Sequence, residues 1–115
     1  MDRLTEERIA TNNAQFREAN EHIRDAAEKH AVANGVPFIC ECPDPSCTDI
    51  LRLDLADYLA IRANARWFIK APSHGPDPGP AARIVRETGS HLVVEKVGRA
   101  GEVAEALAAE QAADE

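Results

Sequence analysis

All three cysteines of the 115-residue chain fall in one stretch, Phe38-Ile39-Cys40-Glu41-Cys42-Pro43-Asp44-Pro45-Ser46-Cys47. In an extended chain, side chains two residues apart leave the same face, so Cys40 and Cys42 are predicted to point to one side of a strand. The prolines and the aspartate that follow predict a turn that returns Cys47 toward them. Three converging thiols indicate a zinc site, because zinc takes sulfur and nitrogen ligands in tetrahedral geometry.

A tetrahedral zinc site needs a fourth ligand, and two histidines are candidates. His74 lies in a proline-rich loop over residues 72–80, where proline and glycine release the chain from regular structure. His91, beside a predicted turn at Gly89-Ser90, is the second choice. The sequence therefore predicts a Zn²⁺ site formed by Cys40, Cys42, Cys47 and His74.

Other interpretations of the cysteines stay open. Two of them can be small buried hydrophobic side chains, with the third thiol at the surface. Cys40 or Cys42 can instead pair with Cys47 under oxidation, which would make the group a redox switch. A permanent disulfide is the weakest interpretation, because the number of cysteines is odd and residues 1–7 lack the apolar core of a secretory signal.

The composition is that of a small acidic domain. Thirteen Lys and Arg residues stand against 20 Asp and Glu residues, which gives a formal net charge of −7. This charge disfavours generic nucleic-acid binding, because phosphate contacts need a basic patch. No apolar run reaches the roughly 20 residues of a membrane-spanning helix. We therefore expect a cytoplasmic protein without a membrane contact.

Residues 5–33 predict one long N-terminal helix. Thr5 fits its N-cap, and Asn34-Gly35 fits its C-terminal stop. A narrow stripe recurs every seven residues and consists of Ile9, Phe16, Ile23 and His30. Asn12, Asn13 and Asn20 interrupt this stripe, which argues against a strong autonomous coiled coil. The helix is expected to pack across its own sheet or, as the alternative, to dock on a partner.

The middle of the chain predicts strands joined by turns. Residues 36–55 are expected to form two strands connected by the cysteine loop, and Trp67-Phe68-Ile69-Lys70 a further strand. Residues 83–88 and 91–97 flank Gly89-Ser90, which suits a tight turn, so they predict a second hairpin.

Two more helices complete the predicted fold. Asp54 fits the N-cap of a short helix that ends near Asn64, and residues 101–113 are rich in alanine and glutamate, as expected of a C-terminal helix. The predicted fold class is α+β, with the long N-terminal helix packed on a small antiparallel sheet of hairpins. We expect one zinc-binding domain over residues 1–98, followed by the C-terminal helix and a frayed tail over residues 99–115.

Five motifs occur in order along the chain: Asn-x2-Phe-Arg-x2-Asn (residues 13–20), Phe-x-Cys-Glu-Cys-x-Asp-Pro-x-Cys (38–47), Leu-x-Asp-Tyr (55–58), Phe-x-x-Ala-Pro-x-His (68–74) and Val-Val-Glu-Lys (93–96). Together they resemble a group of short uncharacterised bacterial proteins, over nearly the whole chain to Gly98. The resemblance implies a three-cysteine, one-histidine site at Cys40, Cys42, Cys47 and His74, and it implies no particular activity. In the group the histidine commonly follows Pro-Gly, whereas Ser73 precedes it here.

Three functions are compatible with such a site. The first is a structural zinc site in a regulatory or adaptor module, which binds another protein through the N-terminal helix or the hairpins or forms a homodimer. The second is a redox or metal sensor whose zinc loop is released on oxidation. The third and least favoured is a small zinc enzyme, with a metal-bound water and His74 or Glu41 as general base. Four protein ligands would close the coordination sphere, which favours the first.

Overall fold

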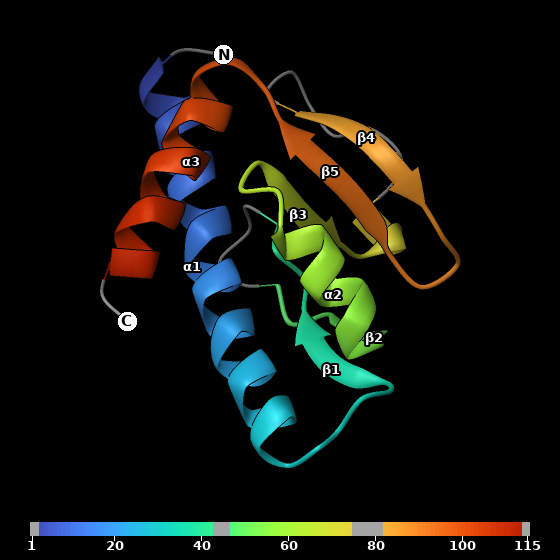
Figure 1. Ribbon diagram of the computed structural model, residues 1–115. Helices are drawn as coiled ribbons and strands as arrows, with labels where there is room; N and C mark the ends of the chain where they lie inside the picture. The colour runs from blue at the N-terminus through green and yellow to red at the C-terminus, as the bar shows by residue number, and fades with distance from the viewer. Residues whose placement is uncertain (1–2, 43–46, 75–81, 114–115) are drawn as a thin grey trace.

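The computed structural model describes residues 3–42, 47–74 and 82–113, and within these ranges the side chains from residue 11 to residue 111 (Figure 1). In this part of the chain the helices are α1 (Arg3–Lys29), α2 (Leu55–Arg62) and α3 (Gly98–Ala113). The strands are β1 (Val36–Ile39), β2 (Ile50–Leu53), β3 (Trp67–Lys70), β4 (Ala82–Glu87) and β5 (Leu92–Lys96), and a short 3-10 helix, η1 (Pro72–His74), follows β3. The predicted α+β class is confirmed.

The strands form two antiparallel sheets rather than one. β1 pairs with β2, and β5 lies between β3 and β4. In the first sheet Phe38 is opposite Leu51. On both strands buried apolar residues alternate with more exposed residues. In the second sheet Phe68 is opposite Val94, and β4 carries an irregularity between Ile84 and Arg86. Both predicted hairpins are present.

The ends of α1 differ from the prediction. The helix already includes Arg3, so the prediction of Thr5 as N-cap is wrong. At the other end the helix stops at Lys29, before the predicted stop at Asn34-Gly35. Ala31 adopts a positive φ of 57°, and the amides of residues 31 and 32 donate to the carbonyls of residues 28 and 27. This pattern is a Schellman motif, which terminates the helix although its left-handed residue is not glycine.

The buried face of α1 also differs from the predicted stripe. Its buried side chains, within the described part, are Asn13, Ala14, Arg17, Asn20 and Ala27. Phe16 and Ile23 are only half-buried, His30 is exposed, and the side chain of Ile9 lies outside the described residues. α1 packs along α3 and against β1 of its own chain (Figure 1). Three polar side chains therefore occupy the face that meets the rest of the molecule.

Apolar side chains gather in two main clusters. The larger cluster contains residues of β1, β2 and α2, residues in and just after β3, Ala27 of α1 and Val93 of β5. In it the Phe38 ring stacks on Tyr58 with centroids 4.0 Å apart. The smaller cluster consists of Phe68, Ala82, Val94 and Ala104, so it joins the three-stranded sheet to α3. Cys40 and Cys42 belong to the larger cluster, which places the predicted ligands at the edge of the main core.

Some sequence predictions lie outside the described residues. These are the turn at residues 43–46, the proline-rich loop beyond His74 at residues 75–81, and the tail at residues 114–115. Among the helices that the structure describes, none combines the length and apolar character that crossing a membrane requires.

Candidate metal centre

The structure brings together the four predicted ligands. The candidate ligand atoms of Cys40, Cys42, Cys47 and His74 all lie within 4.8 Å of one another. Zinc–sulfur bonds of about 2.3 Å at tetrahedral angles would set two sulfurs about 3.8 Å apart, so small side-chain rotations suffice to close the group around an ion. The four side chains are therefore close enough to hold one metal ion.

Hydrogen bonds of the backbone position Cys40 and Cys42. The amide of Cys40 donates to the Asp49 carbonyl at 3.0 Å, which continues the pairing of β1 with the segment before β2. The amide of Glu41 donates to the Ile69 carbonyl at 2.8 Å, which ties the same segment to β3. Both cysteines are buried, with exposed fractions of 1% and 2%. The segment that follows β1 thus links the two sheets where the thiols converge.

His74 reaches the cysteines from η1. Its amide donates to the Ala71 carbonyl at 3.1 Å, which closes the turn after β3. Its Nε2 atom lies 3.4 Å from the Sγ atom of Cys47, so Nε2 is the ring nitrogen that faces the group. The carboxylate of Asp49 lies 3.6 Å from the same nitrogen and accepts a hydrogen bond from the Ser73 hydroxyl. The His74 side chain remains 26% exposed.

The surroundings of Cys40 favour a cation. Burial raises the pKa of the Cys40 thiol far above its ordinary value, and the neighbouring Cys42 and Cys47 raise this pKa further. The amide of Ala71, which donates to the Cys40 sulfur at 3.3 Å, acts in the opposite direction. Three thiolates this close would repel one another without a positive charge between them. A bound cation would stabilise the thiolate forms, as metal ligands require.

His91, the alternative fourth ligand, lies outside this group of four. Its Nδ1 atom is 2.8 Å from the Ser90 hydroxyl and 3.1 Å from the Thr88 hydroxyl. Burial lowers the pKa of His91, and the nearby Arg86 lowers it further. The contacts of Nδ1 are those of a residue that closes the turn between β4 and β5.

Sequence reasoning missed a buried polar network around Glu41. The side chain of Glu41 is 0% exposed, although it stands between two of the cysteines. Its carboxylate accepts hydrogen bonds from Asn20 at 2.8 Å, from the Ile69 amide at 2.9 Å and from Arg62 at 3.0 Å. Its backbone carbonyl accepts a hydrogen bond from the side-chain amide of Asn13. Glu41 therefore contacts α1, α2 and β3 at once.

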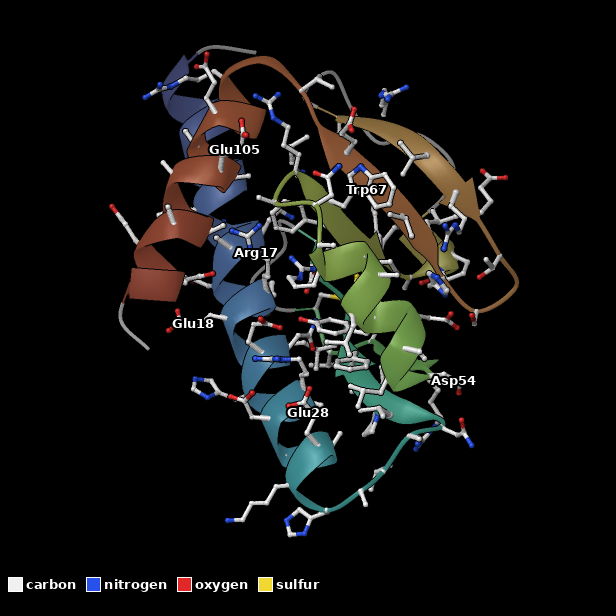
Figure 2. The ribbon with its side chains drawn as sticks, viewed as in Figure 1. Arg17, Glu18, Glu28, Asp54, Trp67 and Glu105 are labelled. Carbon is white, nitrogen blue, oxygen red and sulfur yellow. The ribbon has the colours of Figure 1, made fainter. Side chains whose placement is uncertain are left out.

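Asn20 and Arg17 extend this network along α1. Asn20 also exchanges two hydrogen bonds with the backbone of Ile39, at 2.8 and 2.9 Å. Arg17, labelled in Figure 2 on α1, donates to the carbonyls of Ala65 and Ala104, and its guanidinium lies 4.7 Å from the centroid of the Phe68 ring. Burial lowers its pKa to about 10, and Arg62 contributes to this shift.

A signal for this network was present in the sequence. Asn13, Arg17 and Asn20 follow the spacing i, i+4, i+7, which places them on one face of a helix. Within the helix alone the asparagines have the pattern of interruptions in an apolar stripe, because none of their partners is close in sequence.

A pocket of about 360 Å³ opens between α1, α2 and α3. Its wall includes Arg17, Glu21 and Arg62, and none of the four candidate ligands lines it. This pocket therefore does not open onto the candidate metal centre.

No protein-family model, curated protein or solved structure matches the chain. The fold and the site define it as a small α+β domain whose Cys3His group is close enough together to hold a metal ion. The function has to be argued from that site, since a fold by itself does not imply one.

Proposed function

We propose that the protein is a zinc-binding module in which Cys40, Cys42, Cys47 and His74 hold one structural Zn²⁺ ion. The convergence of the four ligand atoms within 4.8 Å carries this proposal. Three sulfurs and one imidazole nitrogen are a ligand set that suits zinc, whereas calcium and magnesium prefer oxygen ligands. The motif resemblance points to the same four residues, and we propose that the chain belongs with those short bacterial proteins.

The proposed role of the ion is to join the two sheets. Cys40 and Cys42 follow β1, whereas His74 follows β3, so one ion would link the small sheet to the larger one. A two-stranded hairpin is marginally stable alone, which gives such a link a structural purpose. Four protein ligands would leave no position for a water or a substrate. We therefore assign the module a regulatory or adaptor role toward another protein, in a reducing compartment such as the cytoplasm.

Metal analysis of the purified full-length chain tests this proposal. We expect one zinc per chain, and we expect both Cys47→Ser and His74→Ala to lose the metal and to unfold at lower denaturant concentration. The matched control is His91→Gln, which changes the histidine outside the group and should keep its zinc. A protein without bound zinc would contradict the proposal, and retention of zinc by His74→Ala would indicate an open site instead.

A second function, thiol-based sensing, is favoured by the unequal exposure of the ligands. Cys47 and His74 are partly exposed, whereas Cys40 and Cys42 are buried. Peroxide would therefore reach the Cys47 thiolate first and oxidise it to a sulfenic acid, with a reduced peroxide oxygen leaving as water or hydroxide. A neighbouring cysteine would then displace water to form a disulfide, and the zinc would leave.

A peroxide titration tests sensing, with zinc release and proteolysis of the His74 segment as readouts. Stoichiometric release of zinc together with faster cleavage is the expected result. Retention of the metal with unchanged cleavage would leave only the structural role.

A further inference from the structure

The position of Glu41 connects the cysteine group to the rest of the fold. Because Glu41 lies between Cys40 and Cys42, a movement of either cysteine's backbone also moves Glu41. Its buried carboxylate has donors from three separate elements, Asn20 of α1, Arg62 of α2 and the Ile69 amide of β3. A buried carboxylate is stable only with such partners, so these elements depend on its position.

The anchoring of α1 on this segment is mainly polar. Asn13 binds the carbonyl of Glu41, and Asn20 binds both Glu41 and Ile39. Apart from these asparagines and Arg17, the buried side chains of α1 in the described part are alanines. A donor and an acceptor that separate beyond about 3.5 Å no longer form a hydrogen bond. A displacement of residues 39–42 by one or two ångströms would therefore weaken the attachment of α1 to this segment.

We propose that metal binding and the docking of α1 are coupled through Glu41. An ion held by Cys40 and Cys42 fixes the segment that α1 binds, and its loss weakens the contacts of Asn13 and Asn20. Coupling of this kind is reciprocal, so undocking of α1 would weaken metal binding by the factor by which loss of the metal weakens docking. This inference rests on the proposed zinc site and describes its regulation, since the docking of α1 would depend on whether the metal is bound.

Zinc affinity of variants on α1 tests the coupling. Asn20→Ala removes the contacts with Glu41 and Ile39 without touching a ligand, and we expect zinc affinity to fall 10- to 100-fold, as for other residues that orient metal ligands. Affinity is measured on the full chain by competition with a chelator of known zinc affinity. His22→Ala, on the exposed side of the same helix, is the matched control and should change the affinity less than twofold.

A second control separates coupling from a general loss of stability. Val94→Ala removes two methyl groups from the smaller apolar cluster, which does not include residues 39–42. We expect it to leave zinc affinity within twofold of the wild type. Equal weakening by Val94→Ala and Asn20→Ala would overturn the coupling, and so would wild-type affinity in Asn20→Ala.

Hydrogen exchange of the wild-type protein gives a measurement that does not depend on a variant folding. Chelation of zinc should speed exchange of the α1 amides at residues 13–29 at least tenfold more than exchange in β5. Unchanged protection of α1 would overturn the coupling while the zinc site stands. A wild-type protein that binds no zinc would overturn both, so the two failures are distinguishable.

Discussion

The two sheets of this molecule are stabilised by different interactions. The three-stranded sheet packs on α3 through Phe68, Val94 and Ala104, and contacts of this kind depend on buried area. The β1–β2 sheet also packs on apolar side chains, but its end is held by the Glu41 network and carries the candidate metal ligands. Hydrogen bonds require a donor–acceptor distance below about 3.5 Å and a suitable angle, and metal ligands require set bond lengths and angles. The part of the fold that bears the candidate site is therefore also the part with the strictest geometry.

Metal removal should destabilise the β1–β2 sheet more than the three-stranded sheet, and this is the largest expected effect. Structural zinc contributes several kcal/mol or more to the folding of small domains, so chelation should remove at least a hundredfold of amide-exchange protection from β1 and β2. Protection of β5 should change less, because its Val94 packs in the smaller cluster, which contains no ligand, and only its Val93 packs in the cluster of Cys40 and Cys42. Exchange followed by NMR or mass spectrometry measures both sheets in one sample. Equal loss in both would show that they unfold as one unit.

Truncation of one core residue from each sheet sharpens the comparison. Phe38 is fully buried and stacked on Tyr58, so Phe38→Ala should lower the free energy of unfolding by about 3–5 kcal/mol. Val94→Ala should lower it by about 1–2 kcal/mol, since it removes only two buried methyl groups. Urea denaturation of the zinc-loaded proteins measures both values. We also expect only Phe38→Ala to weaken zinc binding, and the reverse order would contradict the distinction between the sheets.

The smallest expected effect concerns Lys96, a buried lysine at the end of β5 in the three-stranded sheet. Burial, together with the smaller effect of the nearby Lys70, lowers the pKa of Lys96 from 10.5 to about 8. Between about pH 8 and 10.5 the unfolded chain binds more protons at this site than the folded chain. The contribution of Lys96 to stability therefore improves as pH rises through this interval, and its cost is fully present below pH 8.

Replacement of this lysine tests the assignment. Lys96→Met removes the buried charge, and at pH 7 we expect a gain of about 1–2 kcal/mol in the free energy of unfolding, which vanishes above the ordinary lysine pKa of 10.5. Urea denaturation at several pH values measures this difference. Titration of the Lys96 ammonium near its ordinary value, followed by NMR, would show that the site is better solvated than its burial indicates.

Local rules of the chain predicted most of the secondary structure. Leu51 and Leu53 alternate with exposed residues as a half-buried strand requires, and Gly89-Ser90 stands where the second hairpin turns. The end of α1 could not be predicted in the same way, because Ala31 occupies a left-handed position that an alanine rarely adopts. Gly35 therefore fits the sequence pattern of a helix stop, although it follows the end of the helix by several residues.

The polar face of α1 needed the tertiary structure. Asn13, Arg17 and Asn20 have partners that are 19 or more residues away in sequence, and a side chain with distant partners looks like an interruption when only its own helix is considered. The burial of Glu41 could not be predicted either, because glutamate is almost never fully buried unless it is paired, and its partners lie far away in the sequence.

The sequence by itself determined which ligand atoms are available to a metal and that two of them point to the same side of the backbone. Cys40 and Cys42 lie on one side of an extended segment because side-chain direction alternates along the backbone, which is a local property. Only the tertiary structure decided that His74 rather than His91 joins the cysteines, and that Glu41 ties them to α1. These are contacts between segments far apart in the chain, and they depend on how the helices and sheets pack rather than on any local preference.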